Sequence, residues 1–278
     1  MSDDLAQSEN NLTKINAELD KRNRDRKGKF ARFTVAALSS IPWVGGFIGA
    51  AASLHGEFDQ DKVDDLQRQW LQLHEERLAN LGATLADILR RLEEIGAVAD
   101  ERIEDPGYHA LVQQGFRIWD QAITEEKREL VKKVLINAGG TTLCSDDVVR
   151  LFLDWIEAYH EAHFAVIREI HNDRGITRGE IWQRIHGTPV KENSAEADLF
   201  KYLMRELSTG GVIRQIKATD SDGHFLRQRQ RRKSLGPYMK SAFDTDEPYE
   251  LTELGRQFVH YAMTDVVPRL GGAESDET

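Results

Sequence analysis

His160 and His163 are the residues whose type and spacing come nearest to a metal-binding pattern. In the zinc metalloprotease motif, two histidines stand four residues apart on one helix face, with two residues between the Glu and the second His. Here the histidines are three residues apart, and no third ligand is evident in the sequence. We therefore interpret them as partly exposed helix residues rather than as metal ligands.

Other signatures of catalysis are also missing from the sequence. It contains no G-x-x-x-x-G-K-[ST] phosphate loop, no G-x-S-x-G nucleophile motif and no dinucleotide-binding fingerprint. The single cysteine, Cys144, excludes an intrachain disulfide and a cysteine-rich metal site, which indicates a reducing compartment such as the cytoplasm. We therefore expect a cytoplasmic protein that is not an enzyme and that has no catalytic residue, metal or cofactor.

Basic residues toward the C-terminal end are candidates for contact with phosphate. Arg227, Arg229 and Arg231 alternate along the chain, which places them on one face of a strand. The net charge of −10 repels phosphate, so any such binding depends on a local basic patch. A solvated edge strand that its charge protects from aggregation is the alternative interpretation. The candidate nucleic-acid-binding residues are Lys201, Arg205, Arg227, Arg229, Arg231, Arg232 and Lys233.

The segments around these residues predict two short helices, a hairpin and a returning helix. Thr177 and Glu180 form a capping-box pattern at the start of the first helix, and Ser194 can cap the second. A β-like run, VIRQIK, precedes a turn at Asp220–Gly223, and the phrase YELTELGR comes before the last helix. The basic residues therefore lie on the second helix and on the hairpin.

This order of elements resembles the winged helix-turn-helix of PadR-like and MarR-like bacterial regulators, over roughly Ile176 to Met263. The most specific likeness is Tyr249–Arg256, which is similar to the Y-x-L-T-x-x-G phrase at the end of the second wing strand. In a DNA-reading member the second helix enters the major groove and the wing touches phosphate. Here that helix is mixed in sign, so DNA binding and protein docking both stay open. Its polar residues are Glu196, Asp198, Lys201, Tyr202, Arg205 and Glu206.

The stretch between Arg32 and Glu57 contains no Asp, Glu, Lys or Arg. It is long enough to cross a bilayer core, but its Pro, Gly and Ser residues make insertion close to balanced. Pro42 and the glycines after it can bend the stretch into a helical hairpin, and the preceding basic run would lie near anionic headgroups. The hairpin is either buried in a bundle or conditionally associated with the inner membrane. Its candidate residues are Phe33, Ile41, Pro42, Trp43, Val44, Gly45, Gly46, Phe47 and Ile48.

The whole pattern predicts a mainly α protein, with an N-terminal helical bundle or coiled coil and a C-terminal winged helix. Apolar residues at helical spacing indicate a long helix from Val63 that Asp105-Pro106-Gly107 ends. Thr124 can cap the next helix, and Gly139-Gly140 releases the chain at its far end. The expected divisions are an amphipathic helix and basic run (1–32), an apolar Gly-rich hairpin (33–56), a helical bundle (57–144), one connecting helix (145–175), a winged-helix domain (176–266) and a disordered tail (267–278).

Residues 30–140 also resemble bacterial proteins grouped near the abortive-infection alpha family. The likeness consists of the Ile41–Gly46 apolar segment, the long charged helix, Asp105-Pro106 and the run Thr124–Leu130. This resemblance implies a role in antiviral defence, by membrane disturbance or by sensing infection.

Three functions follow as hypotheses. The leading one is a bacterial antiviral-defence effector, or a component of one, whose conditionally membrane-active helical region is controlled by a winged-helix sensing or docking domain. The alternatives are a DNA-binding transcriptional regulator that dimerises through its N-terminal helices, and a non-catalytic protein-interaction subunit. The expected partners are further copies of the chain in a homo-oligomer, a protein encoded nearby, the membrane, and DNA through the wing.

Overall fold

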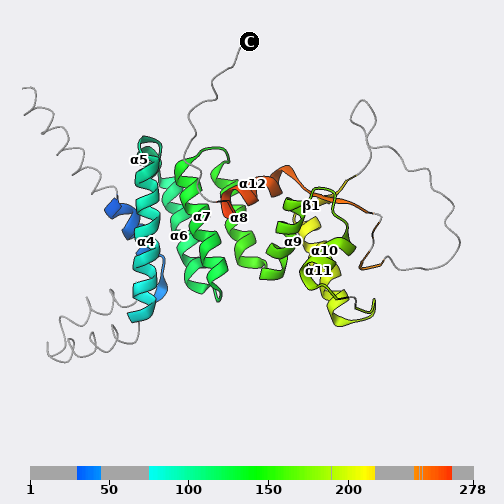
Figure 1. The fold of residues 1–278 in the computed structure, drawn as a ribbon. Helices are drawn as coiled ribbons and strands as arrows, with labels where there is room; N and C mark the ends of the chain where they lie inside the picture. The colour runs from blue at the N-terminus through cyan, green and yellow to red at the C-terminus, as the bar shows by residue number, and fades with distance from the viewer. Residues whose placement is uncertain are drawn as a thin grey trace, which may run out of the picture. The chain divides into compact units, whose positions relative to one another are not determined.

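The structure is a computed structural model that describes residues 30–44, 75–188, 190–216, 241–243, 245 and 247–264 (Figure 1). The chain divides into two compact units, one of residues 1–157 with 264–278 and one of residues 158–263. We call them the helical unit and the second unit. The expected mainly α class is confirmed for the described residues, which form helices and two short strands. The expected N-terminal amphipathic helix and the C-terminal tail lie outside the described residues.

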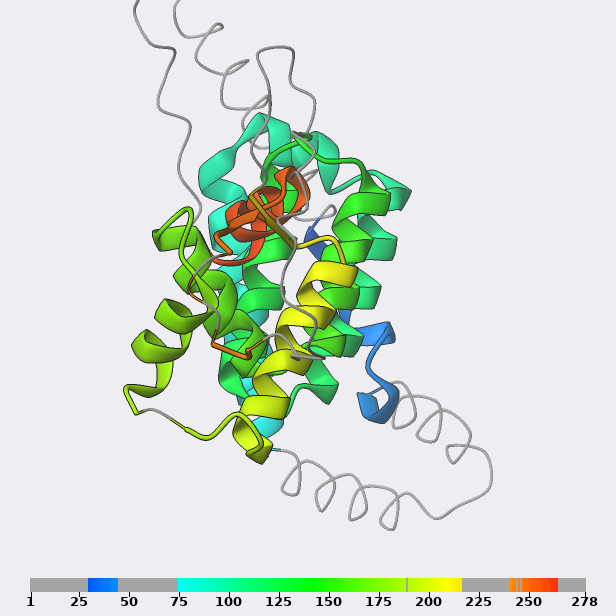
Figure 2. The same cartoon turned by 90° about the vertical axis from the view of Figure 1, so that its right-hand side faces the viewer.

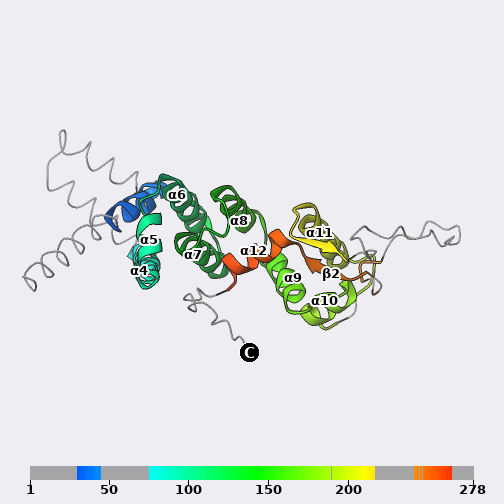
Figure 3. The same ribbon diagram turned by 90° about the horizontal axis from the view of Figure 1, so that it is seen from above.

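The described residues of the helical unit form a helix over residues 30–39, a helical turn at residues 42–44 and five further helices. In Figures 1 and 3, α4, α6 and α7 lie side by side, and their facing residues form the core of this unit. Its helices are α4 (Glu75–Ile95), α5 (Ala97–Arg102), α6 (Pro106–Gln121), α7 (Glu125–Gly140) and α8 (Asp146–Ala158).

The expected long helix ends earlier than Asp105. It breaks at Gly96, whose positive φ of 80° is a conformation that L side chains rarely adopt. Asp105 instead begins a helix, because its side chain accepts a hydrogen bond of 2.9 Å from Gly107 N–H and caps α6. Pro106 occupies the first helical position, where its missing N–H costs nothing.

The helix α7 ends at the glycine pair, as expected, because Gly140 is its last residue and Thr141 takes an extended conformation. Gly139 and Gly140 also have a packing role that the sequence did not indicate. A Cβ atom on Gly139 would lie 2.5 Å from Leu92 Cδ2, and one on Gly140 would lie 2.7 Å from Ile95 Cδ1. These glycines therefore let α7 approach α4 closely. The predicted cap at Thr124 is present, since its side chain accepts a hydrogen bond from Lys127 N–H.

The described residues of the second unit form four helices and a two-stranded antiparallel sheet (Figure 2). Arg214 pairs with Glu250 across the strands, and an isolated bridge joins Thr177 to Pro248 beside them. Thr177 and Ser194 cap their helices as predicted, Thr177 within a complete capping box. The elements are α9 (Glu161–Asn172), α10 (Arg178–His186), α11 (Ala195–Thr209), β1 (Ile213–Gln215), β2 (Tyr249–Leu251) and α12 (Glu253–Ala262).

The expected single connecting helix over 145–175 is wrong. These residues form α8 and α9, and the chain leaves helical geometry between them at Tyr159 and His160. His160 takes an extended conformation and serves as the N-cap of α9. The apolar spacing continues across this break without a Gly or Pro, so periodicity alone could not reveal it.

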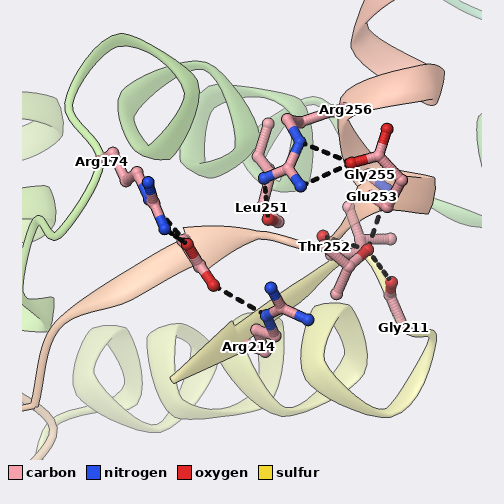
Figure 4. A network of polar contacts seen from close by, with 10 residues as sticks. Arg174, Gly211, Arg214, Leu251, Thr252, Glu253, Gly255 and Arg256 are labelled. Carbon is pink, nitrogen blue, oxygen red and sulfur yellow. Dashed lines mark hydrogen bonds and ion pairs between the residues drawn. The ribbon is translucent and has the colours of Figure 1, made fainter. Parts of the chain in front are cut away.

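The Y-x-L-T-x-x-G phrase fixes the junction between β1, β2 and α12 (Figure 4). The Thr252 hydroxyl donates to Gly211 O at 2.6 Å and accepts from Gly255 N–H at 2.9 Å, which caps α12. A Cβ atom on Gly255 would lie only 2.1 Å from Val212 O, so the helix can approach this carbonyl only with glycine there. The residues of the Y-x-L-T-x-x-G phrase therefore have a packing role, which does not depend on what the second unit binds.

Candidate functional site

The first half of the apolar segment is packed in the helical unit. Phe33 is fully buried, with its ring centroid 6.2 Å from that of Tyr108 and 6.4 Å from that of Phe116. Ile41 and Val44 are buried as well, whereas Pro42 is exposed. The predicted residues Gly45, Gly46, Phe47 and Ile48 lie outside the described residues.

Trp43 is held by a polar contact that we call the Trp43 anchor, formed by Trp43, Asp120 of α6 and Arg77 of α4. The indole N–H donates to Asp120 Oδ1 at 2.7 Å, and an Arg77 guanidinium N–H donates to the same oxygen at 2.7 Å. The Arg77 guanidinium also lies over the indole, 4.8 Å from its centroid, which favours a cation–π contact. One carboxylate thus joins the apolar segment to two helices.

The expected bend at Pro42 and the glycines after it is described only up to Val44. The helix of residues 30–39 ends in a turn at Ser40, and helical geometry resumes at residues 42–44. The second arm of the expected hairpin lies outside the described residues. Within the described ranges, no helix has both the length and the apolar character needed to cross a membrane.

The two candidate nucleic-acid-binding residues of α11 do not form a free basic patch. Lys201 Nζ lies 3.8 Å from Glu192 and 3.6 Å from Asp198, and it donates to Glu192 O at 3.2 Å. Its charge is therefore directed toward acidic neighbours, while Arg205 is exposed. The wing candidates Arg227, Arg229, Arg231, Arg232 and Lys233 lie outside the described residues.

The surface of α11 carries two adjacent exposed side chains, one apolar and one aromatic. Leu199 is 53% exposed and Tyr202 is 49% exposed, and their spacing of three places them side by side on the helix. The Tyr202 hydroxyl donates to Glu206, one turn further on. We call Leu199, Tyr202 and Glu206 the α11 stripe. Single exposed apolar residues need no explanation, but adjacent ones on one helix face are typical of binding surfaces.

His163 is buried rather than partly exposed, which corrects the expectation for it. Its Nδ1 accepts a hydrogen bond of 3.0 Å from the His160 backbone N–H, so Nε2 carries the proton and donates to Glu206 at 2.9 Å. The ring stacks on Tyr159 with centroids 4.8 Å apart. His160 is exposed, as expected, and no cluster of three metal-ligand side chains occurs in the described part of the chain.

The charges of this group are set by the same contacts. Burial lowers the pKa of His163, because desolvation disfavours the imidazolium and outweighs the attraction of Glu206. The hydrogen bond from Tyr202 lowers the pKa of Glu206, and the contact with His163 adds to this effect. At neutral pH a neutral histidine and a neutral tyrosine therefore hold an ionised Glu206.

A second polar network covers the outer face of the sheet (Figure 4). Glu250 of β2 is only 5% exposed and accepts hydrogen bonds from Arg174 at 2.7 Å and Arg214 at 2.8 Å. Burial alone would raise the pKa of Glu250, but the two guanidiniums outweigh this effect and lower it. The network ties the α9–α10 connection to both strands, so its role is structural.

Comparisons with known proteins add no family. No protein-family model, curated protein or solved structure matches the chain.

Proposed function

We propose that the chain is a non-catalytic protein-interaction subunit whose second unit is a winged helix that docks a partner protein through α11. The observation that carries the proposal is the adjacent exposure of Leu199 and Tyr202, at 53% and 49%, on the helix that would read DNA in a winged-helix regulator. Trp, Tyr and Arg side chains supply much of the binding energy at protein interfaces, so an exposed tyrosine such as Tyr202 fits an interface, whereas phosphate contact requires free cations.

The charges on α11 support the same proposal. Lys201 lies within 4 Å of two carboxylates, Asp198 and Glu192, that a DNA phosphate would have to displace. Glu196 and Asp198 add negative charge to the first turn, which would face the groove. Repulsion of phosphate by these acids favours a protein partner over a nucleic acid.

The experiment compares Leu199→Asp and Tyr202→Asp with Ile123→Asp, a matched control at an apolar residue of the helical unit that is 95% exposed. Each tagged full-length variant is recovered from its native cells, and the bound proteins are quantified. A protein that remains with Ile123→Asp and is lost from both α11 variants supports the proposal. Equal recovery from all variants contradicts it, as does a DNA mobility shift that both α11 variants abolish.

Membrane disturbance in antiviral defence is a second candidate function. The observation that favours it is the Trp43 anchor, in which the Asp120 carboxylate accepts a hydrogen bond from Trp43 near the start of the uncharged stretch. We propose that loss of this contact frees the stretch to enter a bilayer, where the basic residues before it would meet anionic headgroups.

Dye-loaded vesicles of phosphatidylglycerol and phosphatidylethanolamine test the second candidate. The variant Asp120→Ala removes the anchor, and Asp154→Ala is the control, because Asp154 is an exposed carboxylate that accepts one hydrogen bond from Gln114 of α6. Leakage that rises with Asp120→Ala alone supports membrane disturbance. No leakage from either variant or from the unmodified protein at high concentration contradicts it.

A further inference from the structure

Among the acidic side chains of α11, Glu206 has surroundings suited to recognising a cation. Its side chain is 36% exposed, and both carboxylate oxygens are held by neutral donors, Oε2 by His163 Nε2–H and Oε1 by the Tyr202 hydroxyl. Within the described part of the chain, no Lys or Arg forms an ion pair with it. By contrast, Asp198 already pairs with Lys201, and Glu196 accepts hydrogen bonds at the helix N-terminus.

The position of the Glu206 carboxylate is fixed by the buried side chain of His163. His163 is fully buried, its Nδ1 is occupied by the His160 N–H, and Tyr159 stacks against its ring. The imidazole therefore cannot turn away without losing a hydrogen bond and a ring contact. A carboxylate fixed in this way binds a cation with less loss of side-chain entropy than a freely rotating one.

The neighbours of Glu206 suggest which cation fits. Tyr202 lies four residues before Glu206 and Leu199 seven residues before it, so all three lie along one side of α11. An aromatic face beside a carboxylate accommodates a planar guanidinium, which can stack on the ring and donate to the oxygens at once. A lysine ammonium cannot do both with the same geometry.

We infer that the α11 stripe is an arginine-recognition site, which accepts an apolar, arginine-bearing segment of a partner protein. The arginine pairs with Glu206 and stacks on Tyr202, while an apolar side chain of the same segment covers Leu199. This inference rests on the proposed docking function and names the chemistry of the partner. Charge complementarity selects the occupant, because the carboxylate has only neutral donors and an anionic group would be repelled.

Peptide display on the immobilised full-length chain tests the inference with random peptides as the probe. We expect the selected peptides to contain arginine near an apolar residue and to bind more weakly when that arginine is replaced by lysine. The variant Glu206→Gln removes the charge but keeps one oxygen acceptor for His163 Nε2–H, and its NH2 group can donate to the Tyr202 hydroxyl oxygen, which also accepts. It should weaken binding on the order of tenfold or more, because a hydrogen bond to a charged group is lost. Glu196→Gln, on the same helix, is the matched control and should bind as the unmodified protein does.

Amide chemical shifts give a second readout that does not depend on a selected peptide. Titration with N-acetyl-arginine methylamide should shift the amide signals of residues 199–206 in the unmodified chain, and much less in Glu206→Gln. N-acetyl-lysine methylamide should give smaller shifts. The spectra also report whether Glu206→Gln remains folded, so loss of binding through misfolding is recognised.

The outcomes separate this inference from the proposed docking function. Peptides that bind α11, lose binding with Tyr202→Ala and show no dependence on arginine or on Glu206→Gln would overturn the arginine site and leave docking intact. Peptides that bind elsewhere, together with no arginine-induced shift at residues 199–206, would overturn both. Equal responses to the arginine and lysine probes would likewise overturn the specificity for arginine.

Discussion

Replacing Asp120 by alanine should loosen residues 30–44 by an amount that the Trp43 anchor allows us to work out. The hydrogen bond from the Trp43 indole to this carboxylate is charge-assisted and should contribute about 1.5–3 kcal/mol. The Arg77–Asp120 ion pair joins α4 to α6 and persists when the segment opens, so it adds nothing to this free energy. The expected loss for Asp120→Ala is therefore about 1.5–3 kcal/mol of the free energy that opposes opening of the segment.

Hydrogen exchange of the full-length chain measures this opening directly. A loss of about 1.5–3 kcal/mol corresponds to a fall of roughly 10- to 150-fold in the protection of amides in residues 33–41. Arg77→Ala should lower their protection much less, because Trp43 keeps its acceptor. The segment should retain some protection in Asp120→Ala, since Phe33 and Ile41 stay buried in their apolar contacts.

Asp154→Ala is the control for a general effect of removing a carboxylate next to α6, and it should leave the protection of residues 33–41 unchanged. If Asp120→Ala changes that protection no more than Asp154→Ala does, the Trp43 anchor contributes nothing and the reasoning is refuted. In that case apolar packing alone would hold the segment.

Four further predictions concern stability. Gly255→Ala should destabilise the second unit by about 1–3 kcal/mol, because the new Cβ would lie 2.1 Å from Val212 O. Gly82→Ala in α4, where a Cβ would meet nothing within 4 Å, should stabilise the helical unit by about 0.5–1 kcal/mol. Thermal unfolding measures both glycine variants. If they change the stability equally, the packing argument is refuted. The lowered pKa of His163 means that the folded state favours the neutral imidazole. The stability that the neutral His163 contributes is therefore present above the pKa of about 6.5 in the unfolded chain and is lost as the pH falls below it. Thermal unfolding between about pH 5 and 8 should show this decline, less steeply in His163→Gln, and an unchanged slope in that variant would count against it. Glu250→Gln should lower the free energy of unfolding in urea by about 1–2 kcal/mol. This is less than for a fully buried ion pair, because Arg174 and Arg214 are both exposed. An unchanged free energy would show that the network does not support the sheet.

Local signals in the sequence predicted local structure well. Thr124, Thr177 and Ser194 all cap helices as expected, because a cap depends on residues within one turn of it. The break between α8 and α9 was missed, since the apolar pattern runs through Tyr159 and His160 without a breaking residue. The end of α7 at Gly139-Gly140 was predicted, but the packing role of the pair was not, because a glycine pair can mark either a helix end or a close approach of helices.

The candidate site depended on long-range contacts that a single sequence does not encode in its spacing. Trp43 could be singled out, but its partner Asp120 lies 77 residues away and neither position marks the other. His163 was taken as partly exposed because its environment comes from Glu206, 43 residues later, and from packing against Tyr159. The exposure of the α11 stripe could not be predicted for the same reason. Helical spacing alone does not say which of two partly apolar faces of a helix is buried.

Photocrosslinking at Tyr202 tests most directly whether α11 docks a protein. A photoreactive phenylalanine analogue is placed at position 202, and at Ile123 as an exposed control, in the full-length chain within its native cells. We expect a discrete crosslinked protein from position 202 that is missing from position 123 and that weakens with Glu206→Gln. Crosslinks from position 202 to nucleic acid alone, or the same products from both positions, would contradict protein docking by this helix.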